Sequence, residues 1–378
     1  MKEGWTYKKL GEVCDFEGGS QPPKSEWINH PQDGYVRMLQ IRDFTKSRNV
    51  DVEYVKITKK LRLCKSDDIL IGRYGASVGK IITGLAGAYN VAIIKSIPDE
   101  VVIRKDFIRR YFESSLFQNL LFNVCTSRAA QAGFSKDDIK EELIPVPPLS
   151  EQQRIVSRLD SAFAHIDELK ANAEKQLSEA HTLFQKALSK AMEPKEGWEE
   201  KTFGDVCSYH KEQGVYQNMK YIGMEHMVSG TGEILGCMSS NDILSSSFKF
   251  NKGEVLYGRL RPYLRKVYIA EFDGCCSTEV FPITSDLIVP GFIKYWLLTD
   301  EITNKVNATS AGCRMPRGNM NEVKKFPFFY PRQKSEQQRI VSRLDALSEH
   351  VRAYEDTQRK IIAECDALKQ ALLRKVFE

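Results

Sequence analysis

The sequence of 378 residues lacks a long apolar run and an apolar segment near its start. A membrane-spanning helix needs about 18 or more consecutive apolar residues, and a secretory signal needs an apolar core close to the N-terminus. The first residues, Met-Lys-Glu-Gly-Trp-Thr-Tyr-Lys-Lys, provide neither. We therefore expect no membrane partner and a cytoplasmic location.

Paired cysteines are also missing. The nine cysteines are scattered, and none are spaced as Cys-x-x-Cys. Zinc sites and disulfide frameworks use such spacings or an even set of cysteines. Cys14 and Cys207 occupy the same place in the two copies of a repeat described below, beside apolar residues. We expect reduced, packed thiols and no metal site.

Motifs for catalysis are absent as well. The run Gly72 to Lys80 is glycine-rich, but Gly75 and Gly79 enclose three residues and Lys80 precedes Ile81. A phosphate-binding loop instead has four residues between its glycines, followed by Lys-Ser or Lys-Thr. The run therefore predicts a strand, a turn and a second strand. No His-Glu-x-x-His, no convincing triad and no Asn-Pro-Pro-Phe type of methyltransferase motif occurs. We expect no catalytic residues and no enzyme activity in this chain.

The composition is that of a globular protein, with 42% hydrophobic and 28% charged residues. This length is sufficient for two domains of ordinary size. The formal net charge is +5, from 55 basic and 50 acidic residues. An excess this small does not by itself indicate a nucleic-acid partner, so the clustering of the basic residues has to provide that evidence.

The strongest feature that is present is an internal repeat. The phrase Ser-Glu-Gln-Gln-Arg-Ile-Val-Ser-Arg-Leu-Asp stands at 150–160 and again at 335–345. A second pair of anchors reads Glu-Gly-Trp from 3 and from 196, followed by Leu-Gly-Glu-Val-Cys from 10 and Phe-Gly-Asp-Val-Cys from 203. The sequence between the anchors differs much more. The chain is therefore a duplication in which a common scaffold carries two divergent surfaces.

Each repeated phrase predicts the start of a long amphipathic helix. Apolar residues follow it at alternating spacings of three and four. Ser150 and Ser335 are placed to cap these helices, and prolines precede both. Because neither helix has a partner in its own copy, we expect the two to pair in antiparallel fashion. The residues expected in this seam, or in contact with a partner, are Ile155, Leu159, Ile166, Leu169, Leu177, Phe184, Ile340, Leu344, Leu347, Val351, Ile361 and Leu368.

The stretches before the helices mix strand-like and helix-like patterns. Short apolar runs predict strands near 52–57, 69–71, 81–82 and 91–94, and a helix follows over 106–124. The second copy repeats this order, with a helix over 290–306. The predicted fold class is α+β, with two domains of mixed α/β structure separated by the antiparallel helices in a pseudo-twofold repeat. The expected boundaries are 1–149, 150–193, 194–334 and 335–378.

Two segments in each copy combine basic, aromatic and amide side chains. The arginine guanidinium can read guanine edges, amides can read adenine, and lysines neutralise phosphates. Taken alone, each segment favours a solvated surface loop. Because both segments recur at equivalent places in the two copies, DNA binding and a surface loop carry equal weight. The candidate DNA-binding residues of the first copy are Arg73, Tyr74, Lys80, Arg128, Gln131 and Lys136. Those of the second copy are Arg259, Arg261, Tyr263, Arg265, Lys266, Arg314, Arg317 and Asn319.

With these residues in view, the whole chain resembles the specificity subunit of type I restriction–modification systems. The likeness lies in Pro-Val-Pro-Pro-Leu-Ser-Glu-Gln-Gln-Arg-Ile-Val at 145–156, in the repeated phrase, in the Gly-Trp opening of each copy and in the two long helices. The second run departs, reading Pro-Phe-Phe-Tyr-Pro-Arg-Gln-Lys at 327–334.

The resemblance implies separate functions for the variable domains, the helices and the partner subunits. Each variable domain would recognise one half of a bipartite double-stranded DNA target, and the helix pair would set the unread gap. Two modification (methyltransferase) subunits would dock on the chain, and restriction (motor-nuclease) subunits would join them. S-adenosylmethionine, ATP and Mg²⁺ would then belong to the partner subunits, with no cofactor in this chain.

Two alternatives remain open on the sequence. The chain could be an interaction scaffold whose two domains bind proteins at a separation set by the helices. The helices could also be a self-contained coiled-coil spacer with no docking role.

Overall fold

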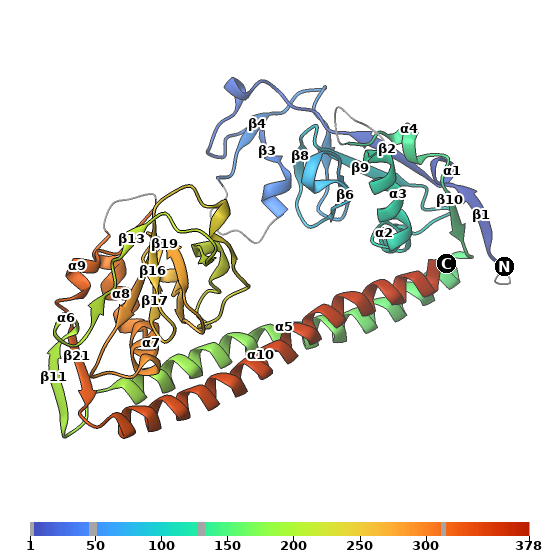
Figure 1. Cartoon of the computed structure of the whole chain (residues 1–378). Helices are drawn as coiled ribbons and strands as arrows, with labels where there is room; N and C mark the ends of the chain where they lie inside the picture. The colour runs from blue at the N-terminus through green and yellow to red at the C-terminus, as the bar shows by residue number, and fades with distance from the viewer. Residues whose placement is uncertain (1–3, 45–50, 127–132, 311–314, 378) are drawn as a thin grey trace. The chain divides into compact units, whose positions relative to one another are not determined.

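A computed structural model of the chain describes residues 4–44, 51–126, 133–310 and 315–377. The chain divides into two compact units, Met1–Asn172 with Lys360–Glu378, and Ala173–Arg359. Each unit holds one mixed α and β domain and part of two long helices (Figure 1). These helices are α5 (Leu149–Met192) and α10 (Lys334–Phe377), and both begin one residue before their predicted starts.

The first domain is built on two four-stranded sheets, in the orders β2-β9-β6-β7 and β4-β3-β8-β5. Its strands are β1 (Thr6–Lys9), β2 (Cys14–Gly18), β3 (Tyr35–Leu39), β4 (Tyr54–Lys56), β5 (Leu63–Cys64), β6 (Ile69–Gly72), β7 (Ile81–Ile82), β8 (Gly87–Tyr89), β9 (Ile93–Pro98) and β10 (Leu143–Val146). Its helices are α1 (Leu10–Val13), α2 (Lys105–Phe112), α3 (Ser115–Thr126) and α4 (Lys136–Ile139).

The second domain repeats this plan with one additional strand, in sheets of order β12-β20-β17-β18 and β13-β16-β19-β14-β15. Its strands are β11 (Trp198–Thr202), β12 (Ser208–Tyr209), β13 (Gln213–Gly214), β14 (Lys220–Ile222), β15 (Met238–Ser239), β16 (Ser247–Phe250), β17 (Val255–Gly258), β18 (Val267–Ile269), β19 (Gly274–Ser277), β20 (Val280–Thr284) and β21 (Pro327–Pro331). Its helices are α6 (Phe203–Val206), α7 (Pro290–Leu298), α8 (Asp300–Ala308) and α9 (Met320–Val323). The pair β3 and β8 is parallel, as is the corresponding pair β14 and β19.

The repeated anchors of each copy pair with each other in space. Strand β1 runs antiparallel to β10, and β11 runs antiparallel to β21. Directly after these strands, the backbone N–H of Leu10 donates to Glu142 at 2.8 Å, and that of Phe203 donates to Phe326 at 2.9 Å. The side chains of Leu10 and Phe203 are fully buried. Each domain is thus closed by its own two ends just before the following long helix begins.

One buried glutamine of the repeated phrase ties α5 to the first domain. The Gln152 side-chain oxygen accepts the backbone N–H of Arg104, the residue before α2, at 2.8 Å. Its amide nitrogen donates to the carbonyls of Val102 at 3.1 Å and Pro147 at 2.8 Å. The buried Gln152 amide makes all of these hydrogen bonds and so fixes α5 in register with the segment before α2. A shift of either segment would leave buried polar groups unpaired, which costs free energy.

Gln337 makes the same set of bonds in the second copy. Its oxygen accepts the N–H of Val289, which precedes α7, at 2.8 Å. Its amide nitrogen donates to Leu287 at 3.1 Å and to Pro331 at 2.9 Å. The repeated phrase therefore has a shared structural task in both copies.

The predicted serine caps are wrong. Helix α5 already begins at Leu149 and α10 at Lys334, so Ser150 and Ser335 are the second residues of their helices. At α5, the first-turn N–H groups donate instead to the carbonyl of Pro148, at 2.9 Å. The reason is that helical geometry extends one residue further back than the serine pattern indicated, in α5 as far as Pro148.

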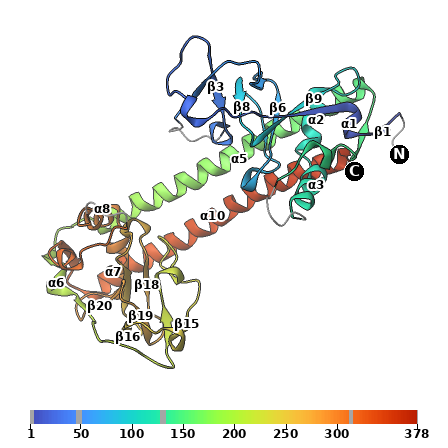
Figure 2. The same cartoon turned by 90° about the horizontal axis from the view of Figure 1, so that it is seen from above.

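The end of α10 belongs to the core of the first domain. The Phe377 ring lies 5.3 Å from that of Phe107 and 5.5 Å from that of Tyr111, centroid to centroid. Phe163 of α5 and the half-buried Trp5 join the same apolar cluster. Both views show α2 beside the C-terminal end of α10 (Figures 1 and 2). Trp5 of the first Gly-Trp segment and Phe377 of α10 thus belong to one apolar cluster.

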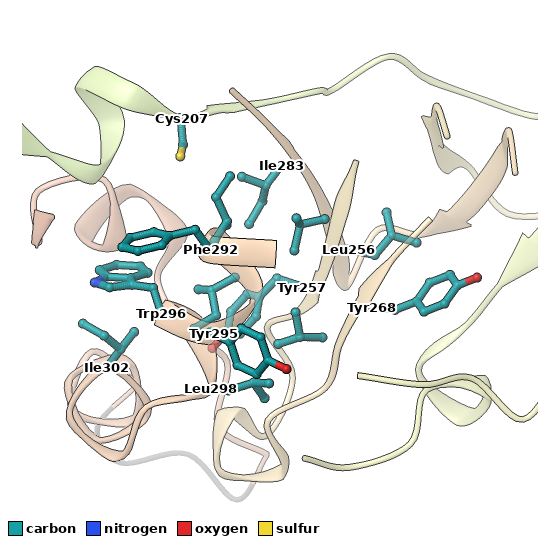
Figure 3. Close-up of a cluster of buried hydrophobic side chains, with 14 of the residues drawn as sticks. Cys207, Leu256, Tyr257, Tyr268, Ile283, Phe292, Tyr295, Trp296, Leu298 and Ile302 are labelled. Carbon is teal, nitrogen blue, oxygen red and sulfur yellow. The ribbon is translucent and has the colours of Figure 1, made fainter. Parts of the chain in front are cut away.

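In the second unit, the end of α5 is part of the domain core in the corresponding way. Phe184, Leu188 and Met192 of α5 belong to the cluster that surrounds α7. Figure 3 shows Phe292, Tyr295 and Trp296 of α7 among side chains from the strands. The Trp296 ring stacks on that of Phe203 at 4.8 Å. The long helices are therefore integral to both domains, and the four-part division expected from the sequence separates segments that pack together.

Within each unit, α5 and α10 run antiparallel to each other. In the first unit Lys170 pairs with Asp366 at 2.7 Å, and Lys369 pairs with Asp167. In the second unit the Tyr354 hydroxyl donates to the Gln176 side-chain oxygen at 3.0 Å. In the first unit Lys170, which follows Asp167 on α5, is joined to Asp366, which precedes Lys369 on α10, so the two helices run antiparallel as the sequence predicted.

The helix expected over 106–124 is instead two helices, α2 and α3, with a break at Glu113 and Ser114. Ser114 is fully buried, and its hydroxyl donates to the Tyr111 carbonyl at 2.6 Å. The helix expected over 290–306 is broken at Thr299, whose hydroxyl accepts the N–H of Ile302 at 3.4 Å and so caps α8. Serine and threonine compete with the helical backbone for hydrogen bonds, a signal that the apolar periodicity did not reveal.

Two smaller predictions are confirmed. The glycine-rich run forms β6, a turn and β7, with Leu70 opposite Ile82. Most of the described thiols are buried, namely Cys14, Cys64, Cys207, Cys275, Cys276 and Cys365, whereas Cys237 is exposed. Burial raises the pKa of the Cys14 and Cys207 thiols to about 12.

Candidate nucleic-acid interface

In the first domain, the two segments singled out in the sequence meet. Tyr74, just after β6, forms an antiparallel bridge with Gly133, just before α4. The Arg73 Nε atom donates to the Phe134 carbonyl at 2.7 Å. The Arg73 guanidinium lies 5.0 Å from the centre of the Tyr74 ring. Segments about 60 residues apart in the chain thus form a single surface.

The second domain brings its two segments together at the equivalent place. Leu260 forms an antiparallel bridge with Arg317. The Arg261 N–H donates to the Pro316 carbonyl at 2.7 Å, and the Gly318 N–H donates to the Arg259 carbonyl at 2.8 Å. We call this pair of joined segments the donor loops of each domain, 72–80 with 133–136, and 257–266 with 315–319.

The donor loops of the second domain contain two strained backbone positions. Arg261 and Arg265 have φ angles of 52° and 50°, in the left-handed region. They flank a short 3-10 turn, Pro262–Leu264, whose proline is buried. Residues other than glycine adopt this region seldom and at a cost, so the surrounding backbone bonds hold the turn in place.

The side chains of the first domain's loops differ in their exposure. Lys80 is exposed, whereas Arg73 and Tyr74 are half-buried. Lys136 is exposed and lies 3.9 Å from the Asp15 carboxylate. Arg128 and Gln131 fall outside the described residues.

In the second domain, Arg261 and Tyr263 are exposed at the tip of the turn. Arg259 and Arg317 both bond to Glu279, each through its Nε atom at 2.9 Å. Partial burial opposes the charge of Glu279, but the hydrogen bonds and charges of Arg317 and Arg259 outweigh it and hold its pKa below the ordinary value. This carboxylate therefore stays ionised between two guanidinium groups.

Other predicted residues of this domain are engaged within it. Arg265 bonds through its Nη groups to the Asp300 carboxylate and the Leu298 carbonyl. The Lys266 Nζ atom donates to the Met224 carbonyl at 2.6 Å. These two cations hold the turn against α8 and against the 3-10 turn that begins at Met224.

Asn319 serves as a helix cap. Its side-chain oxygen accepts the N–H of Asn321 at 3.1 Å at the start of α9, and its own N–H donates to the Thr309 hydroxyl at 2.9 Å. Arg314 falls outside the described residues.

Sequence reasoning did not find Glu279. It lies 20 residues from Arg259 and 38 from Arg317, immediately before β20. Neither separation matches a local pattern, so only the three-dimensional pairing of β17 with β20 reveals it. The one feature of the sequence that marks Glu279 is its place as an acidic residue at the start of a strand-like run.

The predicted seam residues of the long helices fall into three groups. Buried residues are Ile155, Leu159, Ile166, Phe184, Ile340 and Leu344, and half-buried residues are Leu177, Leu347, Val351 and Ile361. Leu169 and Leu368 do not lie in the buried seam, with 57% and 50% of their surface exposed.

Exposed apolar residues recur at equivalent places on the two helices. With the repeat offset of 185, Leu169 corresponds to Tyr354, and Leu183 corresponds to Leu368. Leu183 and Tyr354 are 64% and 43% exposed and line one groove in the second unit. We call Leu169 with Leu368 the first apolar patch, and Leu183 with Tyr354 the second apolar patch.

No helix in the described ranges is long and apolar enough to cross a membrane. No group of three or more His, Cys, Asp or Glu side chains in these ranges could hold a metal ion.

Comparison with known proteins identifies several relatives. One is the type I restriction enzyme EcoDI specificity subunit of Escherichia coli, 27% identical over 281 residues. That match covers 64% of this chain and 63% of the relative, so the chain spans less than two thirds of that protein's length. Another is the StySPI specificity subunit of Salmonella potsdam, 22% identical over 429 aligned positions, with 100% of this chain and 89% of the relative covered.

The fold is also similar to a solved structure. That structure describes complex assembly and conformational transition of the type I R-M system, and one of its chains matches with a TM-score of 0.77. The match covers 99% of this chain and 98% of that one at 17% identity, so it concerns the fold.

The family model described as the type I restriction modification DNA specificity domain matches residues 2–179 and again 195–362. These two ranges together include most of the chain and coincide with the two copies of the repeat. The chain therefore belongs to the family of type I restriction modification DNA specificity domains, of which it carries two copies.

Proposed function

We propose that this chain is the non-catalytic DNA-specificity subunit of a type I restriction–modification complex. Each domain recognises one half of a bipartite duplex target through its donor loops. The observation that carries this proposal is that both domains join two loops at an equivalent place of a shared scaffold, yet present different side chains there. Recognition of two different half-sites requires a shared backbone scaffold that carries different hydrogen-bond donors in each domain.

The chemistry of the loops supports duplex DNA as the ligand. Lys80 in the first domain and Arg261 in the second are exposed cations in loops that also carry Tyr74 and Tyr263. Cations of this kind bind phosphates and fix the register of a protein on DNA, while arginine and amide side chains can read base edges in the major groove.

The helices support the docking of two modification subunits. The first and second apolar patches are equivalent in the repeat and belong to different units. Exposed apolar side chains that recur in this way indicate interaction surfaces, and two equivalent surfaces suit two copies of one partner. We place restriction subunits on this assembly through the modification subunits.

Catalysis is assigned to the partners. S-adenosylmethionine serves methylation in the modification subunits, and ATP and Mg²⁺ serve the restriction subunits. The relatives named above are specificity subunits, which agrees with this assignment. The length of α5 and α10, 44 residues each, would determine the unread gap between the half-sites.

The competing function is a scaffold whose domains bind proteins, and salt dependence separates the two. The chain, co-expressed with its modification subunit, should bind a duplex that carries its bipartite site with an affinity that falls steeply as salt increases, because phosphate binding releases counterions. The site itself is obtained by mapping methylated motifs in cells that express both proteins. An affinity that does not change with salt, or an absence of a methylated bipartite motif, would contradict the DNA function.

A further inference from the structure

Arg259 and Arg317 of the second domain share one carboxylate. The Arg259 Nε atom lies 2.9 Å from one Glu279 oxygen, and the Arg317 Nε atom lies 2.9 Å from the other. The three side chains remain partly exposed, at 32%, 22% and 49% for Arg259, Glu279 and Arg317. We call them the arginine clamp.

Both arginines bond to Glu279 only through Nε. Within the ranges that the structure describes, neither pair of Nη groups has another hydrogen-bond partner. An arginine held by its Nε atom keeps its terminal N–H groups for a planar acceptor, and two such groups can bond to the O6 and N7 atoms of guanine together. The clamp therefore presents two oriented donor forks at one surface.

Two backbone hydrogen bonds and one aromatic ring hold the clamp in place. The Arg259 N–H donates to the Glu279 carbonyl at 2.9 Å, and the Gly318 N–H donates to the Arg259 carbonyl at 2.8 Å. The Arg259 guanidinium also lies 5.3 Å from the centre of the Phe281 ring. A donor that is already ordered loses less conformational entropy on binding, which favours base reading over loose phosphate contact.

In its described residues, the first domain has the same backbone arrangement with fewer donors. Arg73 takes the place of Arg259, since its N–H donates to the Ala92 carbonyl as that of Arg259 donates to Glu279. Ala92 therefore stands where Glu279 stands, and Gly133 stands where Arg317 stands. The Arg73 Nε atom uses the Phe134 carbonyl as its acceptor instead.

We propose that Arg259 and Arg317 read guanine bases in the half-site of the second domain, and that Glu279 is the positioning residue that orients both. This inference rests on the proposed DNA function. It adds the base class, guanine in the major groove, and a residue with no direct contact to DNA. Among the described residues, the two domains then differ in donor number, with one oriented arginine in the first and two in the second.

The first experiment maps methylated motifs for the chain co-expressed with its modification subunit. The variants are Glu279→Gln, Arg317→Lys and Arg259→Lys, with Glu233→Gln as the matched control, because Glu233 pairs with Arg352 outside the donor loops. Glutamine has one acceptor oxygen and no charge, so it cannot hold both arginines. Lysine keeps the charge for a phosphate but lacks the planar fork.

We expect the three clamp variants to accept other bases at guanine positions in one half of the motif, while the other half and the control are unchanged. Unfolding curves that match the wild type show that the fold is retained. A wild-type motif with no guanine in the affected half, or clamp variants with an unchanged motif and only weaker binding overall, would overturn the inference.

The second experiment uses duplexes in which 7-deazaguanine or inosine replaces the guanine at which Arg317→Lys accepts other bases. 7-Deazaguanine lacks the N7 acceptor, whereas inosine retains both N7 and O6 and lacks only the minor-groove amino group. The wild-type complex should lose at least roughly tenfold in affinity with 7-deazaguanine and little with inosine, whereas Arg317→Lys should no longer distinguish the bases. Equal sensitivity to both analogues would overturn the inference. Absence of any salt-sensitive binding by the wild type would instead reject the proposed function.

Discussion

The side-chain oxygen of Gln152 accepts the backbone N–H of Arg104 at 2.8 Å, and thereby joins the start of α5 to the start of α2. Gln337 does the same for Val289 at 2.8 Å in the second copy. The positions correspond at the repeat offset of 185, for the glutamines and for the residues whose backbone N–H groups they accept. The phrase that marks the duplication is thus a structural joint between a recognition domain and the long helix that follows it.

Replacement of the buried glutamine should destabilise the first unit. Gln152→Ala removes three hydrogen bonds and leaves an N–H and two carbonyls without that partner, so we expect a loss of about 3 kcal/mol in the free energy of unfolding. Gln153→Ala is the matched control, because Gln153 is exposed. Urea unfolding followed by circular dichroism measures both. Equal stabilities of the two variants would show that the joint has no energetic role.

Alkaline pH should destabilise the chain through its buried thiols. Burial raises the pKa of Cys14 from an ordinary 9.0 to about 12. The unfolded chain releases this proton above pH 9.0 while the folded chain retains it, so the stabilisation is complete below that pH and is lost as the pH rises toward 12.

Cys14→Ala should therefore make the decline in unfolding free energy shallower, by up to about 1.4 kcal/mol per pH unit above the ordinary value. The exposed Cys237 provides the control variant Cys237→Ala, which should follow the wild type. The measurement is a series of urea unfolding curves from pH 8 upward. A Cys14→Ala slope identical to that of the wild type would contradict this account.

The apolar patches should determine how many modification subunits bind. Leu183→Ser changes the second apolar patch and Leu169→Ser the first, so each variant should reduce the bound modification subunits from two to one. The double variant should bind none. Native mass spectrometry of the co-expressed complex gives the stoichiometry, with Lys186→Ser, an exposed residue of α5, as the control. Two bound subunits in the double variant would place docking elsewhere.

Helix length should set the gap between the half-sites. A seven-residue insertion after Ala173, together with one after the equivalent Gln358, lengthens both helices by about 10 Å and keeps their apolar stripes in phase. We expect the preferred gap to grow by about three base pairs while the bases read stay the same. Mapping of methylated motifs shows the gap directly. An unchanged gap in a complex that still assembles would reject this role.

Much of the frame could be predicted from the sequence, because it depends on local or repeated signals. The spacing of apolar residues after Ser150 predicts α5 to within one residue at each end. The strand and turn around Gly75 follow from apolar runs on either side of a glycine-rich stretch. The helix breaks at Ser114 and Thr299 were not predicted, because the apolar pattern continues across them. At each break a single side-chain hydroxyl bonds to the backbone and ends the helix.

The candidate site could be predicted from the sequence only in part. Basic segments with aromatic neighbours could be found by composition, and the structure joins them in pairs through the Tyr74 and Leu260 bridges. Composition did not distinguish the exposed Arg261 from Arg265, which lies four residues later and is bonded within the domain. Nor could it find Glu279, since that residue meets its arginines only through the pairing of β17 with β20.

Arg261 and Arg265 lie in one turn, but the first is exposed and the second is bonded within the domain. Replacing each in turn therefore separates a role in DNA binding from a role in stability. In the described part of the chain the Arg261 side chain makes no hydrogen bond or ion pair, so Arg261→Ala should leave the melting temperature within about a degree and weaken DNA binding by the second domain. Arg265→Ala removes the bonds to Asp300 and to the Leu298 carbonyl and should cost about 1 kcal/mol of stability.

Differential scanning fluorimetry separates the two arginines by stability, and methylation mapping separates them by function. With Arg261→Ala, the motif should lose base preference in one half only, because the first domain's donor loops are untouched. Loss of preference in both halves would show that the domains do not act on separate half-sites. A large fall in melting temperature for Arg261→Ala would show that its guanidinium supports the turn rather than the DNA.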